Sequence, residues 1–192
     1  MKLVVAGAVG GLAWAGGLRA YMAEVAGAES SYTWMGTMGS IVVPAVVVGS
    51  LLGWSEELRR HGGHRRRWLA LSPLLLPLVT LAQPGAISTL FSTGLGGGAI
   101  AVPLIGLAGA CAVNKQARGW IRVACGAVAL SIIPLWALGS ASIGGNDLAV
   151  TTPHGAMVAL HFYALLAVLA MAAALPLRPT EPRGGRGRSE TA

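Results

Sequence analysis

Long apolar stretches separated by short polar ones dominate the chain. A helix needs roughly 17 to 25 mostly apolar residues to cross a hydrocarbon layer of ~30 Å. Six segments approach or reach that length: residues 3–22, 36–54, 68–83, 95–113, 120–141 and 153–176. The pattern predicts an all-α fold, a polytopic bundle of six transmembrane helices within residues 1–176, with 68–83 as the shortest span. Residues 177–192, rich in Pro, Gly and Arg, predict a disordered basic cytoplasmic tail.

Basic residues indicate how such a bundle would be oriented. The densest charge cluster, residues 56–67, falls between the second and third spans, and such a loop is expected in the cytoplasm. Alternation of the spans then places both termini inside, together with 13 of the 14 Lys and Arg residues. Arg19 alone is directed outward. Trp54, Trp68 and Trp120 fall at the expected inner interface and Trp34 at the outer one, as amphipathic rings prefer.

The composition favours a membrane protein over a soluble one. Of 192 residues, 54% are hydrophobic and 11% charged, against roughly 25% charged in ordinary soluble domains. Twenty-eight glycines and few aromatics suit close packing of helices in lipid. The net charge of +7 does not indicate nucleic acid as a partner, because the cations lie in short loops between apolar segments.

Small residues and prolines suggest how the spans pack. Gly7-x-x-x-Gly11 predicts a close helix approach, although such spacing is frequent by chance in a chain so rich in glycine. Spans two to five each contain proline, which removes a backbone donor and bends a helix. The segment 39–44 recurs as 98–103, which fits either a parallel repeat of helical hairpins or coincidence in low-diversity sequence. Cys111 and Cys125 are expected to act as small hydrophobic residues, because the cytoplasmic side is reducing.

Polar groups in the last span give the first candidate site. Thr152-Pro153 predicts an N-cap and first helical turn, after which His154, Met157 and His161 share one face. His161 falls about 12 Å below the helix start, inside the hydrocarbon, where an ionisable side chain is a functional hypothesis. A facing hydroxyl or backbone carbonyl is expected as its partner. The alternative is a hydrogen-bonded packing histidine.

Further polar side chains gather at the predicted outer side. Arg19 is a candidate contact for an anionic solute, or an anchor beside Glu24 or Glu29. Together with Asp147, these two carboxylates form a candidate outer polar cluster. Imidazole and thioether groups suit Cu(I), which makes His154, Met157, His161, Met35 and Met38 candidate metal ligands. Because His154 and His161 are two turns apart, one ion would need ligands from several helices, and we predict neither a metal site nor a cofactor.

The first two predicted spans also carry a family resemblance. The segment 17–22, with Arg19-Ala20-Tyr21-Met22, is followed by Thr33-Trp34-Met35-Gly36-Thr37. This arrangement resembles small uncharacterised multi-pass proteins of high-GC bacteria, in which an Arg-x-aromatic-Met run precedes a Ser-Trp-x-Gly-Thr run. The resemblance implies a multi-pass protein of the bacterial cytoplasmic membrane and no activity. In size and number of spans the chain is also similar to substrate-binding subunits of energy-coupling vitamin transporters, without a shared motif.

Three function classes follow from these observations. The usual hydrolytic constellations are missing from the sequence, so enzyme chemistry has no visible starting point. The leading hypothesis is a small-solute transporter or transporter subunit whose outer-facing cavity involves His161, His154 and Arg19. The alternative is a non-catalytic assembly or scaffold protein that binds membrane protein partners or a second copy of itself. A membrane-embedded metal or redox protein comes third.

Overall fold

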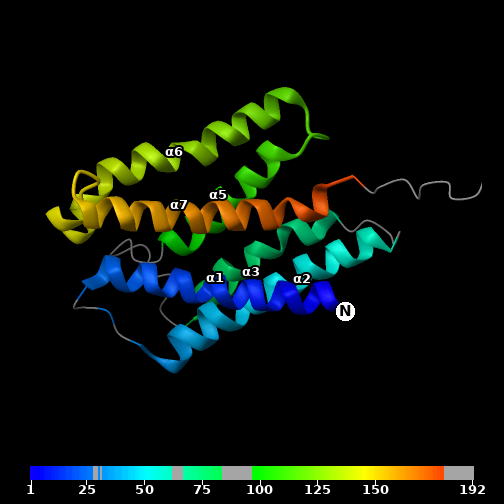
Figure 1. The fold of residues 1–192 in the computed structure, drawn as a ribbon, viewed down its shortest axis with the longest axis horizontal. Helices are drawn as coiled ribbons and strands as arrows, with labels where there is room; N and C mark the ends of the chain where they lie inside the picture. The colour runs from blue at the N-terminus through cyan, green and yellow to red at the C-terminus, as the bar shows by residue number, and fades with distance from the viewer. Residues whose placement is uncertain (28–29, 31, 62–66, 84–96, 180–192) are drawn as a thin grey trace, which may run out of the picture.

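The chain forms a bundle of helices. A computed structural model describes residues 1–27, 30, 32–61, 67–83 and 97–179. These residues are helical apart from short connections and contain no strand (Figure 1). The all-α prediction is therefore confirmed.

Each predicted span corresponds to a helical segment, and several continue past the expected ends. In chain order the elements are α1 (Lys2–Ala26), the π-helical η2 (Trp34–Val42), α2 (Val43–Arg60), the 3-10 segment η3 (Arg67–Leu74), α3 (Leu75–Leu81), α5 (Gly97–Val113), α6 (Gly119–Gly144), the 3-10 turn η4 (Asn146–Leu148), α7 (Pro153–Ala173) and the 3-10 turn η5 (Leu175–Leu177).

Four of these segments are long and apolar enough to cross a membrane: Lys2–Ala26, Trp34–Arg60, Gly119–Gly144 and Pro153–Leu177. The expected third and fourth spans are shorter. Segment Arg67–Leu81 changes from 3-10 to α geometry, and the 17 residues of α5 rise about 25 Å, less than the ~30 Å hydrocarbon layer. Both short segments lie between α2 and α6. If both cross or neither does, the total number of crossings stays even.

The helix ends that carry basic residues gather at one end of the bundle. In Figure 1 the start of α1, the end of α2, the start of α6 and the end of α7 all lie toward the right. Lys2, the pair Arg59 and Arg60, Arg118 and Arg178 belong to these ends. We refer to this end, defined by those five residues, as the basic end. Arg19 is near the opposite end of α1.

Glycines bring α1 and α2 into backbone contact. A Cβ on Gly7 would overlap the carbonyl oxygen of Gly49, and one on Gly11 would overlap that of Ala45. Conversely, a Cβ on Gly53 would overlap the carbonyl oxygen of Leu3. The close approach predicted from Gly7-x-x-x-Gly11 is confirmed. Its counterpart on α2, Gly49-x-x-x-Gly53, was not anticipated.

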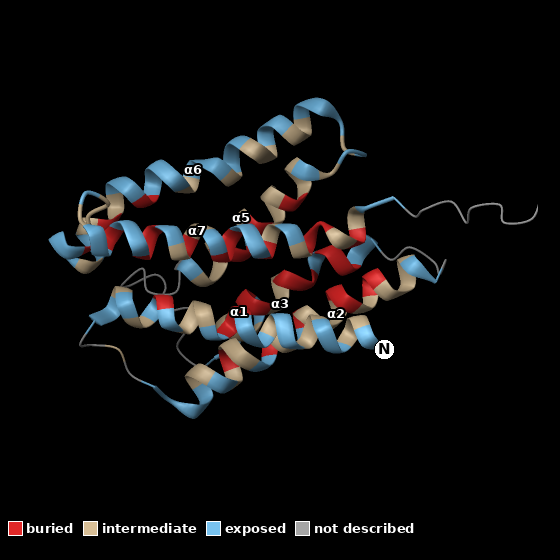
Figure 2. Ribbon diagram, viewed as in Figure 1, coloured by how far each residue is buried: buried red, intermediate tan, exposed pale blue. Residues whose placement is uncertain are grey.

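The core lies where α7 meets α1, α2 and α5, and α6 lies at the edge (Figure 2). Helix α7 buries eight residues along its length, among them Phe162, Leu165 and Leu169. Helix α6 buries only Trp136 and Ser140. Many of its other apolar side chains, such as Val123 and Leu138, are exposed, whereas Ile132 is partly buried against the core. A helix that is apolar all round is expected to face lipid or another protein.

Prolines mark two changes of helix type. Pro44 occupies the first turn of α2, where the π-helical η2 gives way to α geometry, and Pro73 precedes the change from η3 to α3. Because proline lacks an N–H, it fits where the hydrogen-bond register changes. The two copies of the suspected repeat differ here, since residues 39–44 cross the η2–α2 junction and 98–103 lie wholly within α5. Whether they form a true repeat stays a prediction.

The cap expected for the last span is present. The Thr152 hydroxyl accepts a hydrogen bond from the Gly155 N–H at 2.9 Å, and Pro153 is the first residue of α7. At the other end of this span, η5 packs against α2 and η3, so ordered structure includes Leu177. Residues 180–192 of the predicted tail lie outside the described residues.

Candidate functional site

Two predicted residues meet at the end of the bundle opposite the basic end. His154, in the first turn of α7, places its Nε2 atom 3.2 Å from Glu24 Oε2 of α1. Both side chains are at least half exposed. Asp147 is also nearby, because its backbone carbonyl accepts a hydrogen bond from the Thr152 hydroxyl. The structure thus places two members of the predicted outer cluster, Glu24 and Asp147, near the start of α7 beside His154, and the third, Glu29, lies outside the described residues.

Arg19 stacks on an aromatic ring. Its guanidinium carbon is 3.8 Å from the centre of the Tyr32 ring, and Nη2 donates a hydrogen bond to the Ser30 hydroxyl at 3.2 Å. Glu24, one of the two carboxylates expected beside Arg19, pairs with His154 instead. A cation over a ring face is attracted by the ring quadrupole. The contact ties α1 to the segment that leads into η2.

His161 packs against an aromatic cluster made of Tyr21, Trp136 and Phe162. Tyr21 stacks on Phe162 with ring centroids 4.9 Å apart and meets Trp136 at 5.7 Å. The half-buried His161 ring is edge-on to Tyr21 at 6.3 Å. We expected a hydroxyl or a backbone carbonyl to face His161. Among the described residues its neighbour is the Tyr21 ring instead.

Two buried polar atoms beside this cluster have no hydrogen-bond partner among the described residues. They are Trp136 Nε1 and Ser140 Oγ, one helical turn apart on α6. An unpaired buried donor costs about 1–3 kcal/mol. No described contact offsets that cost at these two atoms. The sequence carried a signal for them, because Trp136-x-x-x-Ser140 puts both on the buried face of an otherwise apolar helix.

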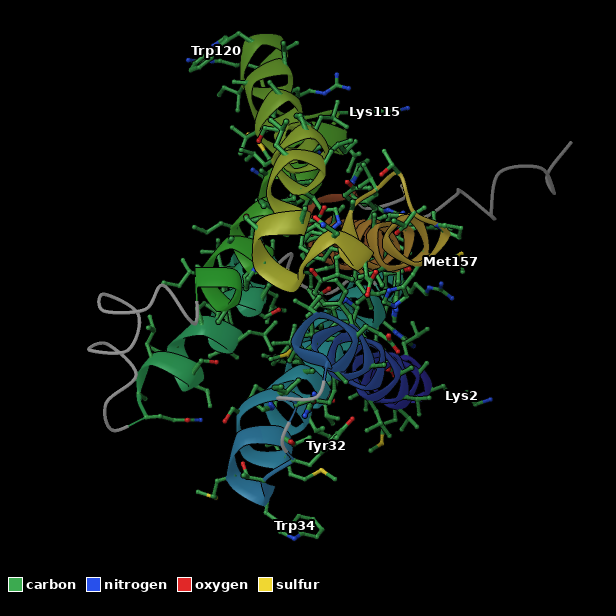
Figure 3. The ribbon with its side chains drawn as sticks, turned by 90° about the vertical axis from the view of Figure 1, so that its left-hand side faces the viewer. Lys2, Tyr32, Trp34, Lys115, Trp120 and Met157 are labelled. Atoms are coloured by element: carbon green, nitrogen blue, oxygen red, sulfur yellow. The ribbon has the colours of Figure 1, made fainter. Side chains whose placement is uncertain are left out.

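The candidate metal ligands do not converge. Met35 and Met38 lie on η2, which packs against α1, α2 and α3, and Met35 is 81% exposed. Met157 points outward from α7, well apart from Tyr32 and Trp34 (Figure 3). In the described part of the chain, no three His, Cys, Asp or Glu side chains are grouped as metal ligands. The Cys111 and Cys125 thiols are free.

A pocket of about 270 Å³ lies between α1, α2 and α7, nearer the basic end. Its walls are glycines and aliphatic side chains, including Gly7 and Gly10 of α1, Gly49 of α2 and Leu169 of α7. Trp14 also lines the pocket, and its indole N–H donates to the Leu165 carbonyl at 2.9 Å. His161 is not among the lining residues. The pocket exceeds the ~150 Å³ that suffices for one benzene ring.

The buried Glu56 carboxylate lines the basic end of the pocket and is paired with two arginines. Glu56 is 6% exposed and is among the lining residues. Arg59 binds both carboxylate oxygens at 2.7 Å, and Arg60 Nε donates to Oε1 at 2.8 Å. A buried charge is tolerated when it is paired and hydrogen-bonded in this way. The spacing of Glu56, Arg59 and Arg60 at i, i+3 and i+4 was a signal for this cluster that the sequence interpretation did not use.

The start of α1 also contacts the end of α2 that carries Glu56, Arg59 and Arg60. The amino group of Met1 forms an ion pair with Glu57 of α2. This contact brings Lys2 to the last turns of α2. The pocket and its surrounding charges were thus missed by sequence reasoning, because they depend on which helices are neighbours.

Comparison of the chain with protein-family models, with curated proteins and with solved structures gives no match. The resemblance of the first two spans to multi-pass proteins of high-GC bacteria stays a prediction.

Proposed function

We propose that this chain is a multi-pass protein of the bacterial cytoplasmic membrane that binds a small solute, as a transporter or transporter subunit. The observation that carries the proposal is the pocket between α1, α2 and α7, with Glu56 lining one end. Largely apolar pockets with a few placed polar groups are the usual sites for small ligands. In a helix bundle such a pocket lies between helices, as here.

The proposed orientation places the basic end in the cytoplasm. Short loops rich in Lys and Arg are retained inside. The opposite end, with His154, Glu24 and Arg19, then faces outward and forms the entrance for a solute. His161, beside the unpaired Trp136 and Ser140 atoms, is proposed as a contact on the way to the pocket. Six spans, with α3 and α5 crossing, are part of this proposal.

The test is purification in mild detergent followed by identification of bound small molecules by mass spectrometry. A small molecule present at up to one per chain is expected. It should be lost in Ala172→Phe, because Ala172 lines the pocket, and retained in Ala167→Phe, an exposed position on the same helix. Proteoliposomes should then move the identified molecule, and His161→Ala should slow its transport without lowering protein abundance. Equal retention in Ala172→Phe and Ala167→Phe would refute the pocket as the site.

A second candidate function rests on α6. Because many of its apolar side chains are exposed, α6 could bind another membrane subunit or a second copy of the chain. In that case a stoichiometric protein partner should copurify. Ala137→Trp, at an exposed position of α6, should release that partner, whereas lipid would accommodate the ring. Copurification unchanged by Ala137→Trp would exclude α6 as the interface.

A further inference from the structure

Positive charge exceeds negative charge at the mouth of the pocket. Glu56 is shared by Arg59 and Arg60, and Glu57 pairs with the Met1 amine, so three of these five described groups are cationic and two are anionic. Lys2 and Arg178 belong to the adjoining helix ends and add to it. This end therefore attracts an anion.

Arg60 is the side chain best placed to bind that anion. It contacts Glu56 through Nε and is 59% exposed, whereas Arg59 is 17% exposed and uses both Nε and Nη2 on the same carboxylate. The Nη groups of Arg60 can therefore serve a second acceptor. Guanidinium groups bind phosphate through paired hydrogen bonds.

The pocket opens sideways between α1 and α7. Among its lining residues, Ala6 and Gly10 of α1 and Val168 of α7 are exposed. A Cβ placed on Gly10 would meet no atom within 4 Å, so space is open at this position. In a bilayer this opening faces hydrocarbon. An apolar chain can enter from the membrane while its polar group stays at the basic end.

We propose that the pocket holds one acyl chain of an anionic phospholipid, whose phosphate is bound by Arg60 and Lys2. Charge complementarity at the mouth, the apolar walls and the lateral opening support this occupant over a neutral lipid. The inference rests on the proposed membrane embedding and on ligand binding in this pocket, and it names as the ligand a lipid that enters sideways from the membrane rather than through the outer end.

The experiment measures lipid binding to the purified full chain in a neutral, mild detergent. Native mass spectrometry is used to titrate phosphatidylglycerol and phosphatidylcholine with identical acyl chains. We expect one phosphatidylglycerol to bind more tightly than phosphatidylcholine. Arg60→Gln should reduce this preference roughly fivefold, as expected for one basic residue at a lipid surface.

Two glycine variants on α1 test whether the pocket is the site. Gly10→Leu fills the open space, and Gly16→Leu is the matched control, because its Cβ also meets nothing within 4 Å and Gly16 does not line the pocket. Gly10→Leu should weaken phosphatidylglycerol binding at least about tenfold, the equivalent of two buried methylenes. Gly16→Leu should leave it unchanged.

Fluorescence gives a second measurement that needs no pocket-filling variant. Phosphatidylglycerol with brominated chains should quench Trp14, so the quenching of the native protein should exceed that of Trp14→Phe. Equal affinity for the two lipids, equal binding by Gly10→Leu and Gly16→Leu, or equal quenching with and without Trp14 would each overturn the inference. If another small molecule copurifies and is lost only in Ala172→Phe, solute binding stands and the lipid assignment fails.

Discussion

At the scale of single residues, Trp14 links α1 to α7. Its ring lines the apolar pocket, and its indole N–H donates to the Leu165 carbonyl, close in sequence to His161 and Phe162 of the aromatic cluster. Tryptophan is useful here because one side chain supplies both a large apolar surface and a donor. A phenylalanine would keep most of the surface and lose the donor.

Trp14→Phe should lower the free energy of unfolding by about 1 kcal/mol, the net contribution of one hydrogen bond. For a chain of this size, the corresponding fall in melting temperature is roughly 2–4 °C. Differential scanning fluorimetry in detergent, with a thiol-reactive dye reporting on Cys111 and Cys125, measures this shift. Trp120→Phe is the control, because Trp120 is 69% exposed and should change nothing. Equal melting temperatures for the two variants would contradict the assigned role of Trp14.

At the scale of elements, contact between α1 and α2 depends on glycine. Gly7 and Gly11 on one helix face Gly49 and Gly53 on the other at the same spacing of four residues. Removing side chains lets the backbones approach and increases van der Waals contact, which drives helix association in lipid. The basic end of the pocket is shaped by this contact, because all four glycines line it.

Gly49→Ala should destabilise the fold by about 1–3 kcal/mol, because its Cβ would overlap the Gly7 carbonyl and push α1 and α2 apart. Thermal denaturation and monodisperse elution in detergent report the loss. The matched variant Gly16→Ala has open space and should be neutral or up to about 1 kcal/mol more stable. A Gly49→Ala protein as stable as Gly16→Ala would show that the helices do not touch there.

The last turns of α5 pack beside the first turns of α6, near the basic end. Cys111 and Cys125 belong to the place where α5 meets α6, since a Cβ on the neighbouring Gly126 would lie 3.7 Å from the Ala112 Cβ. A mild oxidant such as copper–phenanthroline should therefore link them into an intrachain disulfide, in which both thiols are oxidised by copper and oxygen. The product runs faster on a non-reducing gel, and Cys125→Ser abolishes the change. No shift under oxidation would place α5 and α6 farther apart.

The sequence was a good guide to elements and a poor guide to contacts between them. Apolar length located each long helix in the described part of the chain, and the Thr152-Pro153 pair located the start of α7, because both signals are local. The Gly7–Gly49 contact, the stacking of Tyr21 on Phe162 and the pocket depend on which helices are neighbours. His161 illustrates the limit, since its place on α7 was predictable and its aromatic neighbour was not.

At the scale of the whole molecule, charge and apolar surface divide the protein along its length. The helix ends with Lys2, Arg59, Arg60, Arg118 and Arg178 share one end, although they are far apart in sequence. Between the ends, α6 exposes apolar side chains over most of its surface. A bundle with this distribution fits a bilayer, with one charged end on each side.

Crossing of the membrane by α6 is the central claim, and labelling of single cysteines on either side of it tests the claim most directly. Lys115→Cys and Asn146→Cys flank α6 and are introduced into a chain in which Cys111 and Cys125 are replaced by serine. In intact cells, a membrane-impermeant maleimide should label Asn146→Cys and leave Lys115→Cys unlabelled until the membrane is permeabilised. Equal labelling of both positions in intact cells, or labelling of Lys115→Cys alone, would contradict the proposed membrane topology.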